Sequence, residues 1–357
     1  MIPIEKLEVS AYTVPTDLPE SDGTLEWEST TMVVVELYAG GHVGVGYSYT
    51  SPAAVALIRD PLAGAVLGKE DIPAAFAAMS VALRNIGRPG LGSMALSAID
   101  VALWDLKAKQ LGGSLAELLG RAREAVPVYG SGGFTSYTLL QLESELAGWV
   151  GLGIPRVKMK VGREPSADPL RVRRARTAIG PVAELMVDAN GAYTPKQALR
   201  LAATFHDESA VSWFEEPVSH EDHAGLLTVR NRAPMEVAAG EYGSELRDFR
   251  TLLPVIDVLQ ADVTRCQGIT GFLGAATLAL AEQKAISSHC APTIHMHLGA
   301  SVRNFRHLEW FHDHVRIERL FFDGFVEPAE GVLTPAPDRP GLGIELKRAD
   351  MEPFRVA

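Results

Sequence analysis

The chain of 357 residues has 44 acidic and 33 basic side chains, and its formal charge of -11 argues against nucleic acids or anionic membranes as partners, since either needs a basic face. Its 47% apolar content is ample for a packed core, and its length suggests about two domains. Only two cysteines, Cys266 and Cys290, no apolar segment behind a basic N-terminus and no long apolar run together predict a cytoplasmic protein without a membrane span.

Residues 4–49 have the composition of β-strands, in VSAYTVP and in TTMVVVELYAGGHVGVGYSYT, with Gly40-Gly41 as a hairpin turn. Between the first two strands lies a polar segment with Pro and Gly, residues 16–29 (TDLPESDGTLEWES), which we expect to be a long loop, either disordered or functional. From residue 51 to residue 120, Ala-rich segments with apolar i, i+3, i+4 spacing predict helices that end at a Gly-Gly stop. Residues 1–124 are therefore predicted to form an α+β unit.

Beyond Ala125, strand-like and helix-like segments alternate with short connections. The strand-like segments are VPVYGSGG, RVKMKVG, ELMVDANG, VSWFEEP, MEVAAGE, DVLQADVTRC, AISSHC and RHLEWF. Helical patterns separate the first seven, and the link at residues 291–306 is the most weakly marked. This alternation predicts a closed parallel (β/α)8-type TIM barrel over residues 125–325, with its active site at the C-terminal ends of the strands. The Pro/Gly-rich residues 326–357 are expected to return to the first unit.

Three of these strand-like segments end on an acidic residue. Asp188 ends ELMVD, Glu215 ends VSWFE 27 residues later, and Glu241 follows MEVAAG after another 26 residues, and each gap is the length of one strand, one helix and two loops. A single acid could be a helix cap or a loop residue. Three acids in register at a barrel mouth predict a site for a hard divalent cation, with Mg²⁺ expected. Glu216 could compete with Glu215 for the ion.

Two further strand ends carry groups suited to proton transfer. Lys158 and Lys160 lie two residues apart, so both face inward in a barrel, unless they are solvent-facing lysines on a strand edge. Two neighbouring ammonium groups favour deprotonation of each other, so we expect a lysine that can be neutral at physiological pH, with Lys160, nearer the mouth, as the base. Asp262 and His289 end adjacent strands. A carboxylate there would fix the tautomer of the imidazole and raise its basicity, whereas a lone histidine is usually a core residue.

The order of Lys-x-Lys, Asp-x-Asn, Glu-Glu-Pro, Gly-Glu, a sixth-strand Asp and a seventh-strand His resembles the mandelate racemase subgroup of the enolase superfamily, the mandelate racemase/muconate lactonizing enzyme family. The segment ALSAIDVALWDLKAKQLGGSLAELLG is similar to the stretch that joins cap and barrel in that superfamily, so the resemblance covers essentially the whole chain. It implies a modified (β/α)7β barrel capped by the N-terminal region and the C-terminal tail, and a homo-oligomer. It also implies Mg²⁺ ligands, which are Asp188, Glu215 and Glu241.

The same resemblance implies the remaining catalytic roles. Lys160 would be one acid/base and His289, paired with Asp262, the other, on opposite barrel walls. Glu309 in HLEW resembles the eighth-strand glutamate that donates a proton to the substrate carboxylate, with help from Lys158. The family uses such sites with Mg²⁺ to stabilise an ene-diolate formed by removal of the proton α to a carboxylate.

The chemistry that follows is most often dehydration in the His-Asp form of this barrel. We therefore expect a sugar acid to be dehydrated to a 2-keto-3-deoxy acid, with imidazolium His289 protonating the departing β-hydroxyl. Racemisation or epimerisation of a 2-substituted carboxylic acid is the alternative, because the two bases could also invert the α-carbon. A non-catalytic, metal-binding scaffold is a third interpretation.

Substrate recognition is expected from groups beyond the metal and the bases. Candidates are Trp27 within the acidic 16–29 segment, together with Tyr49, Thr50 and Asn190.

Six of the ten histidines fall between residues 289 and 314, including the pairs His295/His297 and His312/His314. These pairs fit either a second metal site or, more simply, histidines satisfied by hydrogen bonds.

Overall fold

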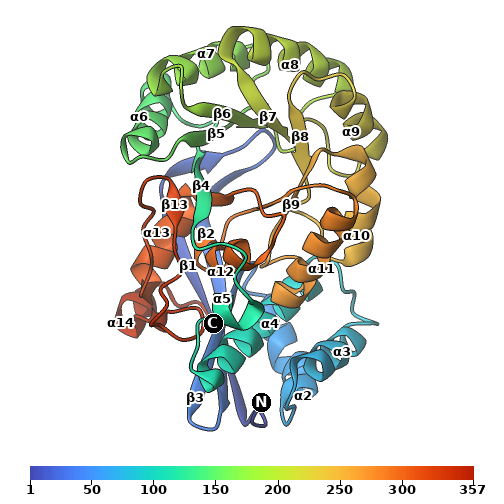
Figure 1. Cartoon of the computed structure of the whole chain (residues 1–357), viewed down its shortest axis with the longest axis vertical. Coiled ribbons are helices and arrows are strands. Elements are labelled where there is room, and N and C mark those ends of the chain that lie inside the picture. Colours follow the sequence, from blue (N-terminus) through green and yellow to red (C-terminus); the bar gives the residue numbers. More distant parts are fainter.

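The computed structural model describes residues 1–357, and its N-terminal part is a three-stranded antiparallel sheet in the order β1–β2–β3 (Figure 1). The strands are β1 Lys6–Ser21, β2 Glu26–Ala39 and β3 His42–Tyr49. The predicted turn at Gly40-Gly41 joins β2 to β3, and both glycines have the positive φ that such a turn requires.

The prediction of a long loop at residues 16–29 is wrong, because β1 and β2 continue through most of this segment as a hairpin. Their pairing is interrupted by a register shift after Pro15 and resumes with Glu20 opposite Trp27. Asp22 closes the turn, since its Oδ1 accepts hydrogen bonds from two of the following backbone N–H groups. The Pro, Gly and acidic residues that suggested a loop belong to the irregular register and to the turn itself.

Helices cover one side of this sheet. They are α1 Ala54–Leu57, the π-helical turn η1 Ile58–Leu62, α2 Ala63–Val66, α3 Ile72–Ala82, α4 Leu91–Leu111 and α5 Leu115–Leu119. The first predicted helix is broken at Asp60, whose backbone is extended because the following Pro61 disfavours a helical residue before it. The long α4 packs on β2 and β3, and Gly46 permits this approach, since a Cβ there would collide with the α4 backbone at Ala98.

The rest of the chain forms the predicted parallel barrel. Its strands are β4 Val126–Gly132, β5 Arg156–Lys160, β6 Glu184–Asp188, β7 Val211–Glu215, β8 Glu236–Ala239, β9 Val258–Ala261, β10 Ile286–Ser288 and β11 Leu308–Phe311. They lie in the order β10–β9–β8–β7–β6–β5–β4–β11, and a bridge between Ile286 and Phe305 brings the two ends of the sheet together. All C-terminal strand ends therefore meet at one mouth.

Helices surround these strands on the outside (Figure 1). They are α6 Leu139–Gly151, α7 Asp168–Ile179, α8 Pro195–Ser209, α9 His223–Arg230, α10 Leu246–Leu252 with the 3-10 turn η2 Leu253–Val255, α11 Gly268–Ala281, α12 Pro292–Ser301 and α13 His312–Phe321. The weakly marked link at residues 291–306 does contain a helix, α12. Nine of its ten residues are buried, so it lacks the alternation of apolar and polar faces by which surface helices are recognised.

The C-terminal segment returns to the N-terminal sheet. It contains β12 Phe322–Asp323, β13 Val332–Leu333, β14 Glu345–Leu346, α14 Arg348–Met351 and the 3-10 turn η3 Glu352–Phe354. β13 pairs with β4, and the backbone of the last residues bonds to β1 at Ala11.

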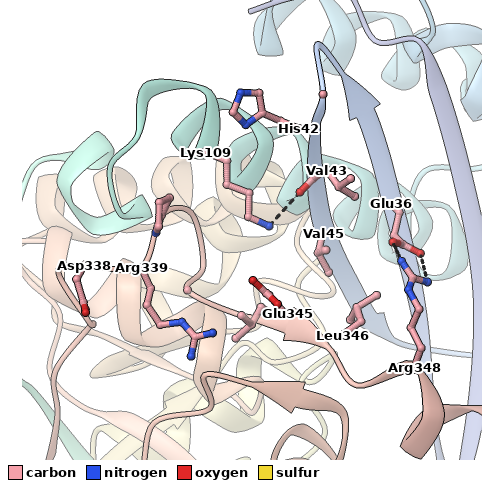
Figure 2. A pocket seen from close by; sticks show the side chains of 14 residues that line it. Glu36, His42, Val43, Val45, Lys109, Asp338, Arg339, Glu345, Leu346 and Arg348 are labelled. Atoms are coloured by element: carbon pink, nitrogen blue, oxygen red, sulfur yellow. Dashed lines mark hydrogen bonds and ion pairs between the residues drawn. The ribbon is translucent and has the colours of Figure 1, made fainter.

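A cleft of about 730 Å³ lies where this tail meets β2, β3 and α4 (Figure 2). Its cationic side chains are engaged in ion pairs, Arg348 with Glu36 and Arg339 with Asp323. None of the acids at the barrel mouth lines it. No helix in the structure is both long and apolar enough to cross a membrane.

The tip of the β1–β2 hairpin presses against the barrel mouth at Gly23. A Cβ at this position would lie 2.5 Å from the carbonyl oxygen of Ala189 and 2.8 Å from that of Val161. We therefore expect Gly23→Ala to lower the free energy of unfolding by about 1–3 kcal/mol, as overpacking does elsewhere, measured by urea denaturation. Gly64→Ala is the matched control, because no atom lies within 4 Å of a Cβ there. Equal stability of the two variants would show that the tip does not press on the barrel.

Candidate active site

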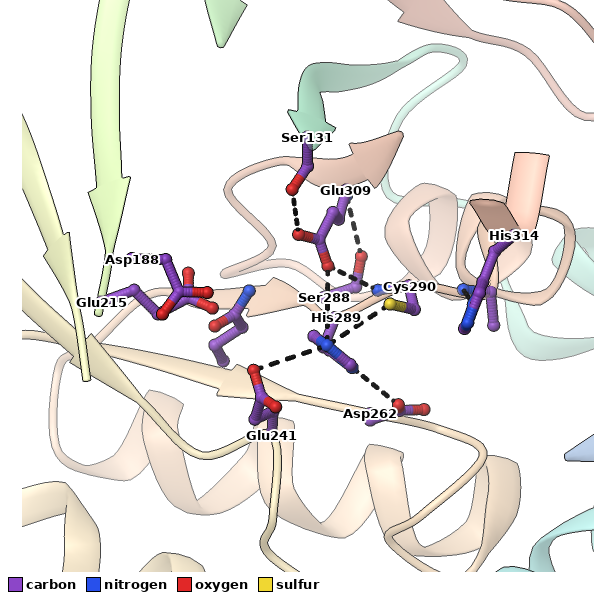
Figure 3. A network of polar contacts seen from close by, with 12 residues as sticks. Ser131, Asp188, Glu215, Glu241, Asp262, Ser288, His289, Cys290, Glu309 and His314 are labelled. Carbon is purple, nitrogen blue, oxygen red and sulfur yellow. Dashed lines mark hydrogen bonds and ion pairs between the residues drawn. The ribbon is translucent and has the colours of Figure 1, made fainter. Parts of the chain in front are cut away.

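Three buried carboxylates meet at the barrel mouth. Asp188 and Glu215 are the last residues of β6 and β7 and lie opposite each other in the parallel register, while Glu241 follows β8 by two residues. One oxygen of each lies within 4.8 Å of the others, and Figure 3 shows Asp188 and Glu215 side by side with Glu241 across from them. Glu216 is buried outside this triad, on a backbone with a φ of 36°.

The triad fits a hard divalent cation. Burial and the neighbouring Asp188 raise the pKa of Glu215 well above its usual range, because each carboxylate in so dry a site disfavours the negative charge of the other. Oε2 of Glu241 is buried and accepts no hydrogen bond. Mg²⁺ prefers oxygen ligands in proteins, and this oxygen of Glu241 is free to bind such an ion.

The two lysines of β5 point into the same cluster. Nζ of Lys158 lies 2.7 Å from Glu215 and 2.8 Å from Glu309, and Nζ of Lys160 lies 2.5 Å from Asp188. Burial acts to lower the pKa of Lys160, but the surrounding carboxylates, Asp188 foremost, together outweigh it and raise this pKa above the usual value.

Each ammonium has its own carboxylate partner in this arrangement, which favours the charged lysine, so a neutral Lys160 stays a prediction for the enzyme with metal bound. A cation bound to Asp188 would weaken that attraction, so metal occupancy and the proton affinity of Lys160 are linked.

Across the mouth, an acid and a histidine form a hydrogen-bonded pair. Nδ1 of His289 lies 2.8 Å from Oδ2 of Asp262, and the other oxygen of Asp262 accepts hydrogen bonds from the backbone N–H and hydroxyl of Thr264. Although burial acts in the opposite direction, the bond to His289 holds the pKa of Asp262 well below its usual range. The ionised acid thus keeps the proton on Nδ1 and leaves Nε2 facing the site, 3.4 Å from Glu241.

Glu309 on β11 completes the ring of polar groups. Its carboxylate accepts hydrogen bonds from the Ser131 hydroxyl at 2.6 Å and from the Cys290 backbone N–H at 2.8 Å, as Figure 3 shows. Burial acts to raise the pKa of Glu309, but the neighbouring cationic side chains, Lys158 foremost, together outweigh it and hold this pKa below the usual range. The expected protonated Glu309 is therefore not the form that these contacts favour, since its ion pair with Lys158 stabilises the carboxylate.

The residues predicted to recognise substrate lie in two different places. The side-chain Oδ1 of Asn190 is buried without a partner, and its backbone N–H donates to Asp188, so this residue adjoins the carboxylate triad. The Trp27 ring packs edge-on against Phe134, which follows β4 at the mouth, with 5.6 Å between ring centroids.

Tyr49 and Thr50 lie at the end of β3 that is away from the Gly40-Gly41 turn, with Tyr49 opposite Met32 in the middle of β2. The Tyr49 ring stacks on His314, and its hydroxyl donates to Glu318 at 3.3 Å. The Thr50 hydroxyl contacts Sδ of Met94. Both side chains join the N-terminal unit to neighbouring helices, and a role in substrate binding stays a prediction.

Sequence reasoning missed two residues that hold the acids in place. Nε1 of Trp213 donates to Glu215 at 3.1 Å, and one guanidinium nitrogen of Arg265 lies 3.2 Å from Glu241 and another 3.5 Å from Asp262. The position of Trp213, two residues before Glu215, puts both side chains on one face of β7 and could have revealed it. Arg265 lies in the turn after β9, where no periodic pattern marks its direction.

Three of the four paired histidines are satisfied by hydrogen bonds. His295 accepts from the Val263 backbone N–H and donates to the Cys290 carbonyl, and burial lowers its pKa to about 4. His297 and His314 also accept from backbone N–H groups. The fourth, His312, is hydrogen-bonded to a side chain instead, through Nε2 to Asp17, and both of its ring nitrogens face carboxylates.

Comparisons with known proteins match the whole length of the chain. Residues 141–350 match the family model described as enolase C-terminal domain-like, and residues 8–120 match that of the mandelate racemase / muconate lactonizing enzyme N-terminal domain. L-talarate/galactarate dehydratase of Salmonella typhimurium is 30% identical, covering 96% of this chain and 89% of that protein. D-galactarolactone cycloisomerase of Agrobacterium fabrum is 31% identical, covering 95% of each.

Solved structures agree in fold. The crystal structure of a mandelate racemase/muconate lactonizing enzyme-like protein from Rubrobacter xylanophilus superposes with a TM-score of 0.98 at 54% identity, covering 99% of this chain and 100% of that one. A racemase from Streptomyces coelicolor with bound magnesium has a TM-score of 0.93 at 28% identity, with coverage of 99% and 100%.

Proposed function

The chain belongs to the mandelate racemase/muconate lactonizing enzyme family of the enolase superfamily, and we propose that it is a Mg²⁺-dependent enzyme that dehydrates a sugar acid to a 2-keto-3-deoxy acid. The observation that carries this proposal is the ionised Asp262 holding His289 with Nε2 toward the carboxylate triad. A histidine so placed can give a proton to a departing hydroxyl, which dehydration needs and simple metal binding does not.

The negative charge that develops during the reaction determines the roles of the metal and of Lys158. Removing the proton α to a carboxylate places a second negative charge on that group, and Mg²⁺ held by Asp188, Glu215 and Glu241 would act as a Lewis acid toward it. Lys158 lies between Glu215 and Glu309, where its ammonium can stabilise the same charge.

Two residues, Lys160 and His289, carry out the proton transfers of the reaction. Lys160 on β5 and His289 after β10 come from strands that are three places apart one way round the closed barrel and five places apart the other way, so they can approach opposite sides of a substrate. One of them removes the α-proton, and the carbon–oxygen bond at the β-carbon then breaks. Imidazolium His289 protonates the departing hydroxyl, which leaves as water, and the enol formed tautomerises to the 2-keto acid.

Racemisation or epimerisation of a 2-substituted acid is the second candidate, favoured by the same pair of groups on opposite walls. Incubation with a panel of acid sugars in D₂O, with assays for both α-deuterium and 2-keto acid, separates the candidates. Dehydration predicts a 2-keto product, whereas racemisation predicts inverted, deuterated substrate and none of that product. Absence of both from a Mg²⁺-loaded protein across the panel would favour a non-catalytic scaffold.

The same family membership leads us to propose a cytoplasmic homo-oligomer with a cap of residues 1–124, a barrel of residues 125–325 and a tail of residues 326–357. Light scattering of the purified chain tests the oligomer.

Trp27 is proposed to exclude water from the distal part of the substrate, since the metal ligands and bases reach only the carboxylate and the first two carbons. We expect Trp27→Ala to reduce kcat/KM by about tenfold or more, which corresponds to a loss of about 1.4 kcal/mol in the transition state. Leu25→Ala is the control, because Leu25 lies two residues before Trp27, in the turn of the same hairpin, but is 61% exposed. Unchanged kcat/KM for Trp27→Ala across the acid-sugar panel would place specificity elsewhere.

A further inference from the structure

A second cluster of metal-ligating groups lies where the hairpin meets the barrel. Asp17 and Glu20 come from the irregular part of β1, and His312 is the first residue of α13. One ligand atom from each lies within 4.8 Å of the others. None of the three belongs to the site described above. His312 lies almost 300 residues after Asp17 in the sequence, so only the fold brings them together.

The cluster has more negative charge than its neighbours balance. Besides Asp17 and Glu20, the carboxylates of Glu145 and Asp313 adjoin it, and the nearby cation is Arg316, which is bound to Asp313. Glu20 and Asp313 are fully buried. Buried carboxylates in such numbers require a compensating positive charge.

Unsatisfied oxygens point to the position of that charge. Oε1 of Glu20 and Oδ2 of Asp313 are buried and accept no hydrogen bond. The other oxygen of Glu20 accepts from Nε1 of Trp27 at 2.8 Å, so the side chain is held while one oxygen stays free. A buried acceptor without a partner costs about 1–3 kcal/mol, so the free oxygen of Glu20, within the cluster, indicates a missing ligand.

The orientation of His312 favours a metal ion. Its Nε2 faces Asp17, at 3.0 Å from Oδ2, on the side of the cluster. Its Nδ1 lies 3.2 Å from Glu145. When one ring nitrogen of a histidine binds a metal, the other commonly donates its proton to a carboxylate, which fixes the tautomer.

We propose that Asp17, Glu20 and His312 bind a second divalent cation, with Glu145 orienting the histidine. One imidazole nitrogen and two carboxylates suit Zn²⁺ or Mn²⁺ better than Mg²⁺. The Asp17 side chain is 45% exposed, so a hydrated ion can reach the site from solvent. Bound there, the cation would fasten the hairpin that carries Trp27 to the barrel, three residues beyond Glu309.

Metal stoichiometry tests this proposal without any assay of activity. Mn²⁺ titration of the metal-free full chain, followed by electron paramagnetic resonance, should give two bound ions per chain. Glu241→Gln removes a ligand of the barrel site and His312→Gln a ligand of the proposed site, so each should bind one ion and the double variant none. His42→Gln, an exposed histidine on β3, should still bind two.

Two outcomes would overturn the second site. One is a wild-type chain that binds a single Mn²⁺ or Zn²⁺ up to millimolar concentration. The other is His312→Gln that still binds two ions. If His312→Gln does not fold, Asp17→Asn at the exposed edge gives the same test. Zn²⁺ should also raise the melting temperature of Glu241→Gln but not that of Glu241→Gln combined with Asp17→Asn.

Discussion

Glu241→Gln is expected to abolish turnover while the chain stays folded. The change removes one charge from the Mg²⁺ ligand set, and we expect a loss of about 4 kcal/mol of transition-state stabilisation, or about a thousandfold in rate. In the absence of metal we expect a lower melting temperature without loss of the fold, because the Glu241 carboxylate has favourable contacts with Arg265 and His289, while the ligands lie at the functional end of the barrel. Turnover, bound metal and the melting temperature measure these effects, and Asp188→Asn should behave alike.

Glu282→Gln provides the control for that variant, because Glu282 is exposed just before β10, at the opposite end of the barrel. It should retain wild-type turnover and metal content. Full activity of Glu241→Gln or Asp188→Asn in the presence of EDTA would contradict the Mg²⁺ site.

Lys160→Ala is expected to stop net turnover but to leave one half of the proton chemistry. If Lys160 and His289 serve opposite faces of the α-carbon, the remaining histidine still exchanges the proton on its own side. The variant should then incorporate deuterium from D₂O only into the substrate configuration that presents its proton to His289, and His289→Asn should do so only into the other. Mass spectrometry of the recovered substrate measures both.

The same experiment identifies a wrong assignment. Equal exchange of both configurations by Lys160→Ala would mean that the two residues do not divide the faces. Lys6→Ala, on the exposed part of β1, is the control for loss of a lysine and should keep full turnover.

The barrel and its acids could be predicted from the sequence because each strand and the acid at its end can be recognised within a few neighbouring residues. Parallel strands end at one edge, so an acid at the end of ELMVD and another at the end of VSWFE must meet, and Asp188 and Glu215 do lie in register. The spacing of Asp262 and His289 placed them on adjacent strands by the same logic, and their side chains are hydrogen-bonded.

The protonation states could not be predicted, because they depend on partners from distant strands. Lys158 and Lys160 are neighbours in sequence, but Glu215, Glu309 and Asp188 determine their charge. The hairpin at residues 16–29 escaped prediction for a related reason. Its two arms are irregular by themselves and are stabilised by contacts with the barrel, such as the bond from the Thr135 backbone N–H to the Ser21 carbonyl.

β1 and β2 run without a break from the N-terminal sheet to the barrel mouth. The tip of their hairpin can therefore be replaced without changing the rest of the sheet. Below the register shift after Pro15, the two strands are fixed by regular pairing and by α4. Beyond it, residues can be gained or lost without altering that pairing, since a bulge absorbs changes in length. Grafting the tip of a relative should therefore transfer substrate preference while the eight barrel residues that carry metal and proton chemistry stay untouched. Specificity and chemistry can diverge separately in this fold.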